Sequence, residues 1–188
     1  MQKLSRNDHI DLYRHLAFCA VGGFFGCYAV LIHSGVMGNA QTVNLIELLL
    51  DALRGDLHAV LLHLGALVLY VLGTMLTVLL PHWWGWDMHY VSPVITAAAA
   101  VTVAFLPETL NTTANAVVSF VCAMQVQTFR KVRGHAYAST MCIGNMRSGT
   151  EALCAYFHTR DKEILHKALT YFGVVLLFAL GAGVGSTA

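Results

Sequence analysis

Charged side chains are scarce in this chain. Of its 188 residues, 11% are Asp, Glu, Lys or Arg, whereas 57% are hydrophobic. An ordinary soluble domain carries roughly 25% charged residues, so we expect much of this surface to face lipid. The formal net charge of +1 also argues against nucleic acid as a partner, because that binding needs a concentrated basic face.

Disulfide and metal patterns are also lacking. The five cysteines form no C-x-x-C pair, and we interpret those in apolar runs as small packing residues. Ten histidines are present, but His58 and His63 are five residues apart and do not share a helix face as an i, i+4 metal pair does. We expect His63 to hydrogen-bond to a neighbouring helix; a metal ligand or a proton relay is the alternative.

No pattern of a catalytic centre is present either. No nucleophile is paired with a base and an orienting acid, so we predict that the protein is not an enzyme and has no cofactor or metal. The glycines at 181–185 follow no strand, and the sequence there indicates close helix packing rather than a nucleotide site.

Five apolar runs predict an all-α integral membrane protein, a single membrane domain over residues 1–188 with five transmembrane helices. A span needs about 20 residues, and the runs are 16–32, 59–80, 90–106, 114–129 and 168–184. The run 114–129 is the weakest because it contains Gln125 and Gln127. Burying an amide without a partner costs on the order of 4–8 kcal/mol in hydrocarbon, so both should face the bundle interior or a cavity. The polar N-terminus carries no cleavage signal, and we expect the first helix to be retained.

Two shorter helices are predicted at about 44–54 and 145–156. In the first, polar residues recur at spacings of three and four, and Gly55 is placed to cap its C-terminus. Such a helix is too short to span the bilayer and too apolar to sit freely in water. We therefore expect both to be interfacial or re-entrant.

A stretch of small and amide residues precedes each short helix. Residues 37–44 read MGNAQTVN and residues 139–145 read STMCIGN, with Asn44 and Asn145 101 positions apart. Each half then has the same order: apolar run, break, short helix, long span. This order predicts a 3+3 inverted repeat, the first copy at about 14–107 and the second, incomplete, at about 112–188. Turns and packing after short helices are the alternative explanation of these residues.

The basic residues indicate an orientation. With five spans and a cytoplasmic N-terminus, every Lys and Arg except Arg54 falls on the inside, ten of the eleven. The two breaks then lie on opposite sides of the membrane, the first outside and the second inside.

Two stretches also resemble a known family. Residues 20–28 (AVGGFFGCY) with 39–44 (NAQTVN), and residues 124–131 (MQVQTFRK) with 140–151 (TMCIGNMRSGTE), are similar to the YoaK-like family, small bacterial inner-membrane proteins classed as a domain of unknown function. The resemblance implies six spans and no established activity. The chain departs from the pattern at Gly26, where an acidic residue is usual, at Val43, where a glycine is usual, and after Gly185, where the last transmembrane helix is expected to be missing.

The expected function is a small transporter or permease-like protein for an unknown solute, in the bacterial cytoplasmic membrane, with its site between the two repeats. Its candidate lining consists of polar residues from the two repeats: Asn39, Gln41, Thr42 and Asn44 from the first, and Gln125, Gln127, Thr140, Asn145 and Arg147 from the second. A non-transporting membrane scaffold or assembly protein is the alternative. The expected partners are the lipid bilayer, a small solute, and either a second copy or a partner helix in place of the sixth span.

Overall fold

Seven α-helices make up the computed structural model of the chain, which describes residues 6–32, 38–132, 135–137 and 139–187. In chain order they are α1 (Arg6–Ile32), α2 (Gln41–Arg54), α3 (Leu57–Trp84), α4 (Met88–Ala104), α5 (Asn111–Thr128), α6 (Cys142–Thr159) and α7 (Lys162–Gly185). A 3₁₀ turn, η1 (Glu108–Leu110), precedes α5, and a hairpin of β1 (Lys131–Val132) and β2 (His135–Ala136) follows it. The predicted all-α class is confirmed, apart from the unpredicted two-residue strands. Met37 of the first break, Lys3 and Arg133 lie outside the described residues.

The two predicted short helices are present, and both begin three residues earlier than expected. Gly55 ends α2 with a φ of 75°, a left-handed conformation that glycine adopts without strain, as predicted. Asp56, Asp87 and Asp161 begin α3, α4 and α7 by accepting a backbone hydrogen bond. Several helix boundaries therefore lie at short turns, where a glycine ends one helix or an aspartate begins the next.

Two helices, α3 and α7, are long and apolar enough to cross a membrane. The 28 residues of α3 extend about 42 Å, more than the roughly 30 Å of a bilayer core. Only 11% of the most apolar stretch of α3 and 28% of that of α7 are buried within the chain. These helices are thus apolar and largely exposed, unlike the core helix of a soluble protein. The five-span arrangement stays a prediction.

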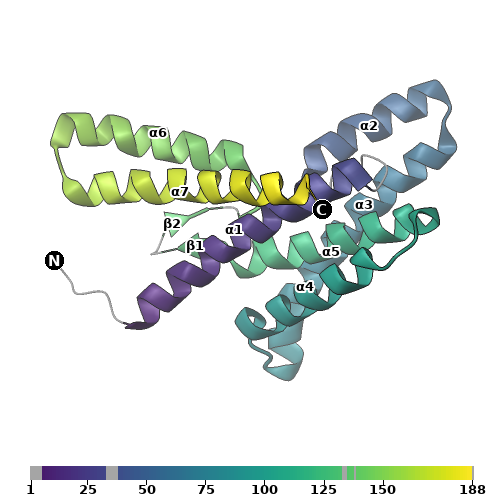
Figure 1. Cartoon of the computed structure of the whole chain (residues 1–188), viewed down its shortest axis with the longest axis horizontal. Helices are drawn as coiled ribbons and strands as arrows, with labels where there is room; N and C mark the ends of the chain where they lie inside the picture. The colour runs from purple at the N-terminus through teal and green to yellow at the C-terminus, as the bar shows by residue number, and fades with distance from the viewer. Residues whose placement is uncertain (1–5, 33–37, 133–134, 138, 188) are drawn as a thin grey trace.

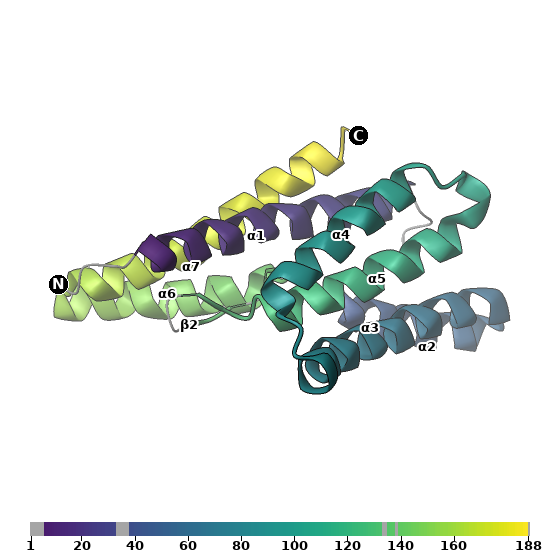
Figure 2. The same cartoon turned by 90° about the horizontal axis from the view of Figure 1, so that it is seen from below.

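Two of the main helix–helix contacts join helices that are not consecutive in the chain (Figures 1 and 2). The first helix, α1, lies along α7, while α3 lies along α5. Each short helix folds back on the long helix that follows it, α2 on α3 and α6 on α7, and α4 packs against α5. The α2–α3 and α6–α7 turns lie at opposite ends of the long axis. Elements far apart in the sequence therefore form the centre of the molecule.

Glycines allow α1 and α7 to approach closely. A Cβ added at Gly181 would lie 1.9 Å from the carbonyl oxygen of Ala20, and one at Gly23 would lie 2.0 Å from that of Phe178. At Gly185 it would lie 2.6 Å from the oxygen of Phe24. Small residues let helix backbones touch without a layer of side chains between them. The predicted packing role of the 181–185 glycines is borne out for Gly181 and Gly185.

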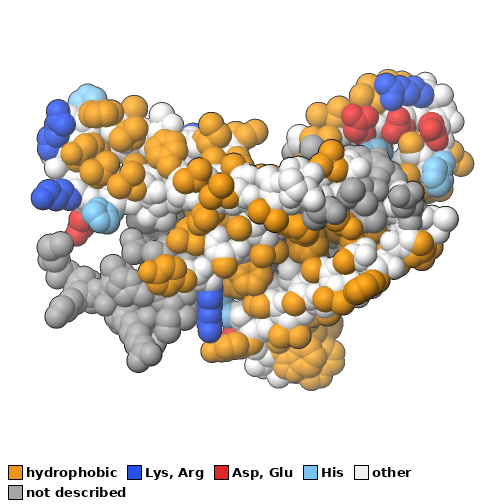
Figure 3. Space-filling view, in the orientation of Figure 1, with side chains coloured by type: hydrophobic (Ala, Val, Ile, Leu, Met, Phe, Trp, Pro, Cys, Tyr) orange, Lys and Arg blue, Asp and Glu red, His pale blue; other side chains and the backbone are white. Residues whose placement is uncertain are grey.

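The core is small and the outer surface is apolar. Phe25, Val103, Val118 and Cys122 form a buried cluster that joins α1, α4 and α5. Many large hydrophobic side chains of the outer faces, especially those of α3, are exposed. Figure 3 shows orange side chains over much of the visible face; most of the charged side chains in view lie at the two ends, where the α2–α3 and α6–α7 turns are, and a basic side chain is also visible near the lower middle.

Candidate functional site

Both helix breaks line one cavity, called the central cavity below, which is open to the surface: of its lining residues, Leu31 is 57% and Ile143 85% exposed. Its volume is about 660 Å³, and its walls come from α1, the chain before α2, the chain before α6, and α7. Residues Asn39 to Val43, except Gln41, line it on one side, and residues Thr140 to Gly144 line it on another. The two stretches that the sequence singled out 101 positions apart are therefore walls of one space.

Three predicted residues meet at this cavity: Asn39, Thr42 and Thr140. The rest of the lining is largely apolar, including Leu31 and Phe178. A mostly apolar cavity with a few polar groups is typical of small-molecule sites.

Gly26 makes room for one of these polar groups. A Cβ at Gly26 would lie 2.4 Å from Nδ2 of Asn39, a separation that atoms do not tolerate. The amide of Asn39 thus occupies the space next to α1 where the family resemblance implies an acidic side chain. A neutral amide from the first break is the polar group at this point of the cavity wall.

The cavity also receives the N-termini of α2 and α6. Thr42 and Val43 in the first turn of α2 and Cys142 to Gly144 in the first turn of α6 line it, and neither helix has a side-chain cap, because Ala40 and Met141 occupy the N-cap positions. Uncapped N-termini present unpaired N–H groups and a partial positive charge. Thr140 is 4% exposed, and its buried Oγ1 has no hydrogen-bond partner among the described residues. These donors favour a ligand with an acceptor or anionic group.

The thiol of Cys142 lies at the start of α6 and also lines the cavity. Burial raises the pKa of this thiol above its ordinary value, since a partly desolvated thiolate is disfavoured. The group is therefore a neutral, weakly polar part of the wall. It does not add negative charge opposite the helix N-termini.

Two other predicted residues, Gln41 and Asn44, form a polar chain beside the cavity rather than part of its wall. Nε2 of Gln41 donates to the carbonyl of Gly38 at 2.8 Å, and Nδ2 of Asn44 donates to Oε1 of Gln41 at 3.0 Å. Asn44 is fully buried, and its Oδ1 lies 3.4 Å from Nδ1 of His63 on α3. The expectation that His63 bonds to a neighbouring helix is confirmed.

Gln125 and Asn145 are buried but do not line the cavity. Nε2 of Gln125 donates to the carbonyl of Phe18 and lies 3.4 Å from Oγ of Ser139, so this amide ties α5 to α1 and to the second break. Nδ2 of Asn145 donates to the carbonyl of Met141 at 2.8 Å, which fixes the first turn of α6. The expectation that Gln125 faces the interior is confirmed.

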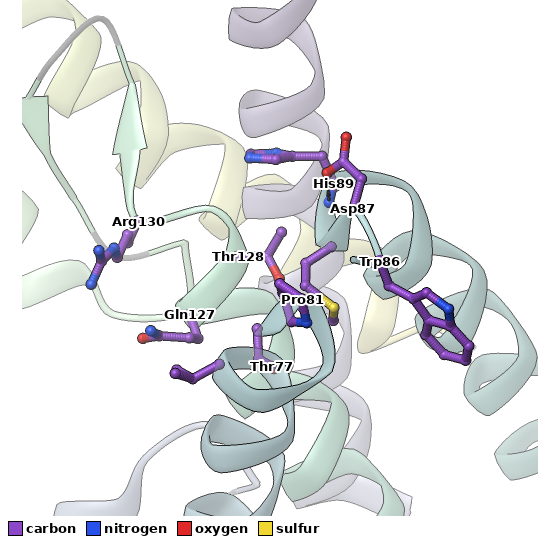
Figure 4. Close-up of a pocket in the computed structure, with 10 residues that line it drawn as sticks. Thr77, Pro81, Trp86, Asp87, His89, Gln127, Thr128 and Arg130 are labelled. Atoms are coloured by element: carbon purple, nitrogen blue, oxygen red, sulfur yellow. Dashed lines mark hydrogen bonds between the residues drawn. The ribbon is translucent and has the colours of Figure 1, made fainter. Parts of the chain in front are cut away.

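The structure separates Arg147 and Gln127 from this centre. The side chain of Arg147 is 79% exposed and pairs with Glu151 at 2.9 Å on the outer face of α6. Gln127 lines a second cavity of about 350 Å³ between the ends of α3 and α5. Figure 4 shows Gln127 and Arg130 on one side of this space and Trp86 on the other. Arg147 thus supplies no charge to the central cavity.

A cluster of aromatic and histidine rings that the sequence did not indicate lies next to the second cavity. The ring of His15 is buried, 5.2 Å from that of Phe129, 5.6 Å from Tyr137 and 6.5 Å from His89. These residues come from four separate segments, so no spacing in the sequence could have indicated the cluster. Among the described residues, no group of three His, Cys, Asp or Glu side chains is arranged to hold a metal ion.

Residues 15–188 match the family described as "Protein of unknown function (DUF1275)". The chain belongs to this family. The match includes both breaks, all of the central cavity and most of α1. No curated protein and no solved structure matches the chain. The membership therefore assigns no activity.

Proposed function

We propose that the protein is a small multi-pass membrane transporter whose solute binds in the central cavity. The observation that carries the proposal is that both helix breaks line this one cavity. Broken helices that direct their N-termini at a shared space are a recurring plan of secondary transporters. In that plan, each half moves against the other around the bound solute.

A membrane location is supported by the surface. The long helices α3 and α7 are apolar and exposed along most of their length. The exposed Arg54 and Lys162 lie next to the α2–α3 and α6–α7 turns, which are at opposite ends of the molecule (Figure 1). With α1, α3, α4, α5 and α7 as spans, the N-terminus lies in the cytoplasm under the positive-inside rule.

An inverted repeat is supported by equivalent packing. If α1–α2–α3 corresponds to α5–α6–α7, the α1–α7 contact is the counterpart of the α5–α3 contact. Each break also packs on the other half: Gly38 lies against Val118 and Ser119 of α5, and Ser139 lies against Gly22 of α1. The two helical hairpins at opposite ends agree with opposite orientations in the membrane.

The solute we propose is small and carries a carboxylate or similar acceptor on an apolar body. The acceptor would meet Thr140 Oγ1 and the N–H groups that begin α2 and α6, while the apolar part would lie near Leu31 and Phe178. A volume of about 660 Å³ lies within the range of about 300–1,000 Å³ usual for small-molecule sites.

Thermal unfolding of the purified protein with a panel of small carboxylates, each paired with its neutral amide, tests the proposal. A bound solute at 100 times its dissociation constant stabilises the folded state by about 2.7 kcal/mol. We expect at least one carboxylate to raise the melting temperature and its amide to do so less. In Thr140→Val, which removes only the hydroxyl, the stabilisation should fall by about 1–3 kcal/mol.

Thr102→Val is the matched control, because Thr102 is exposed on α4 and its hydroxyl bonds within its own helix. The control should respond to the solute like the parent protein. If no acidic solute shifts the melting temperature, or if Thr140→Val and Thr102→Val respond equally, the cavity is not the proposed site. The scaffold alternative would then be favoured.

A further inference from the structure

A chain of hydrogen bonds runs from the first break to a histidine–carboxylate pair, His63 and Asp51, at the α2–α3 contact. It begins at the carbonyl of Gly38 and passes through Gln41 and Asn44 to Nδ1 of His63. Nε2 of His63 lies 3.6 Å from Oδ2 of Asp51, an ion-pair distance. Both side chains are nearly buried, with exposed fractions of 12% and 11%.

The backbone carbonyl at one end fixes the direction of every link. A carbonyl only accepts, so Gln41 turns its NH₂ group to Gly38 and its oxygen to Asn44. Asn44 then donates to Gln41 and turns its own oxygen to His63. Nδ1 of His63 must therefore carry a hydrogen, which leaves Nε2 facing the carboxylate of Asp51. Two acceptors face each other there unless a proton lies between them.

We propose that His63 and Asp51 form an exchangeable proton-binding site whose occupancy sets the hydrogen bonding of the first break at the central cavity. With the proton bound, the imidazolium donates to Asn44 from Nδ1 and to the Asp51 carboxylate from Nε2. Release sends the Nδ1 proton to water and leaves a neutral imidazole that keeps its Nε2–H against Asp51. An imidazole is the side chain suited to such exchange near neutral pH.

Release of the proton changes the hydrogen bonds of this chain one after another, starting at His63. The bare Nδ1 needs a donor, so the amide of Asn44 turns its NH₂ group to His63 and leaves Gln41. Gln41 then has no donor opposite its oxygen and releases the carbonyl of Gly38. Gly38 lies directly before Asn39, which lines the cavity, and packs against α5. The protonation state of His63 is thereby transmitted to the cavity wall.

The surrounding charges are few. On α2, Arg54 pairs with the other oxygen of Asp51 at 3.2 Å and is exposed, which places the pair near water; Glu47 lies on the same helix. His58 and Asp56 lie at the exposed start of α3. Two other helices pack on α3: α5, which has no acidic, basic or histidine residue, and α4, whose His89 lies beside the C-terminal end of α3, away from His63; the side chain of Glu108 in η1 is not among those described. Arg54 therefore offsets the charge that release leaves on the pair.

The proton site is tested by NMR of protein labelled with ¹⁵N-histidine, with His63 assigned from the signals missing in His63→Gln. As the pH is raised, we expect His63 to pass from the doubly protonated ring to the Nε2–H form. In Asp51→Asn, an amide can donate to Nε2, so the neutral ring should keep Nδ1–H instead. The proposal is overturned if both proteins show the same neutral tautomer.

Coupling to the cavity is tested by alkylation of Cys142 with N-ethylmaleimide, in protein without the other cysteines. The reference is Cys154, exposed on the same helix, in a matching single-cysteine protein. Between about pH 5 and 7.5, where thiols are mostly protonated, the ratio of the two rates cancels the effect of thiol ionisation. We expect this ratio to change about fivefold, the factor for one hydrogen bond of about 1 kcal/mol.

The change should disappear in His63→Gln and persist in His58→Gln, which removes an exposed histidine of the same helix. A ratio that is independent of pH, or one that still changes in His63→Gln, overturns the coupling. A role of the coupling in transport depends on the proposed function, but neither measurement needs a solute. Failure of the proton site is therefore distinguishable from failure of the solute site.

Discussion

The closest approach of α1 and α7 offers a direct test of the packing. A Cβ at Gly181 would lie 1.9 Å from the carbonyl oxygen of Ala20, whereas one at Gly183, on the same helix, meets nothing within 4 Å. For Gly181→Ala, the contact must open from 1.9 Å to at least 3.0 Å. Because the opposing atom is backbone, the two helices have to move apart.

The two substitutions should change the free energy of unfolding in opposite directions. Replacing glycine by alanine inside a helix favours the helix by roughly 0.5–1 kcal/mol. Overpacking costs about 1–3 kcal/mol or more, and an immovable backbone contact belongs at the upper end. We expect Gly183→Ala to be neutral or stabilising and Gly181→Ala to be destabilising by at least about 1–2 kcal/mol net.

Thermal unfolding in one detergent, followed by tryptophan fluorescence, measures the difference. For a chain of this size, 1 kcal/mol corresponds to about 2–4 °C in melting temperature. Gly181→Ala should therefore melt several degrees below Gly183→Ala. Equal melting temperatures would refute the close α1–α7 crossing, and with it the placement of α7 beside the central cavity.

Three further predictions follow from the same structure. In single-cysteine proteins in intact cells, His58→Cys should react with an impermeant maleimide added outside and Lys162→Cys should not; the reverse pattern would contradict the orientation. Cys142 should be alkylated more slowly than Cys154 at pH 7, because burial raises the pKa of Cys142 and the thiolate is the reactive form, so its rate should keep rising well above neutral pH. Gln125→Glu should have a free energy of unfolding about 1–3 kcal/mol lower than that of Gln125→Leu at pH 7.5, because a buried carboxylate is costly, and the difference should narrow at pH 5, where protonation of the carboxylate is easier; an unchanged difference would argue against burial of this side chain.

The sequence predicted the individual helices better than the contacts between them. The positions of both short helices, the cap at Gly55 and the interior position of Gln125 follow from local pattern, since helix ends and polar stripes are local properties. The cavity lining was predicted in part. Asn39, Thr42 and Thr140 meet there, but Asn145 bonds its own helix and Arg147 points outward.

The residues that the sequence did not indicate are those joined by distant packing. The contact between Asp51 and His63 depends on how α2 folds back on α3, and the ring cluster at His15 joins four segments. Which face of a helix meets which neighbour depends on side-chain shape over the whole interface. Periodicity alone does not contain that information.

The sequence by itself determined that the chain is helical, very apolar, and interrupted by two similar breaks, because composition and hydrophobic pattern fix local structure. Only the tertiary structure decided that both breaks line one cavity and that α1 packs against α7 while α3 packs against α5. The physical reason is close packing. Glycine contacts such as that of Gly181 with Ala20 bring together backbones about 160 positions apart, and no local preference specifies such a pair.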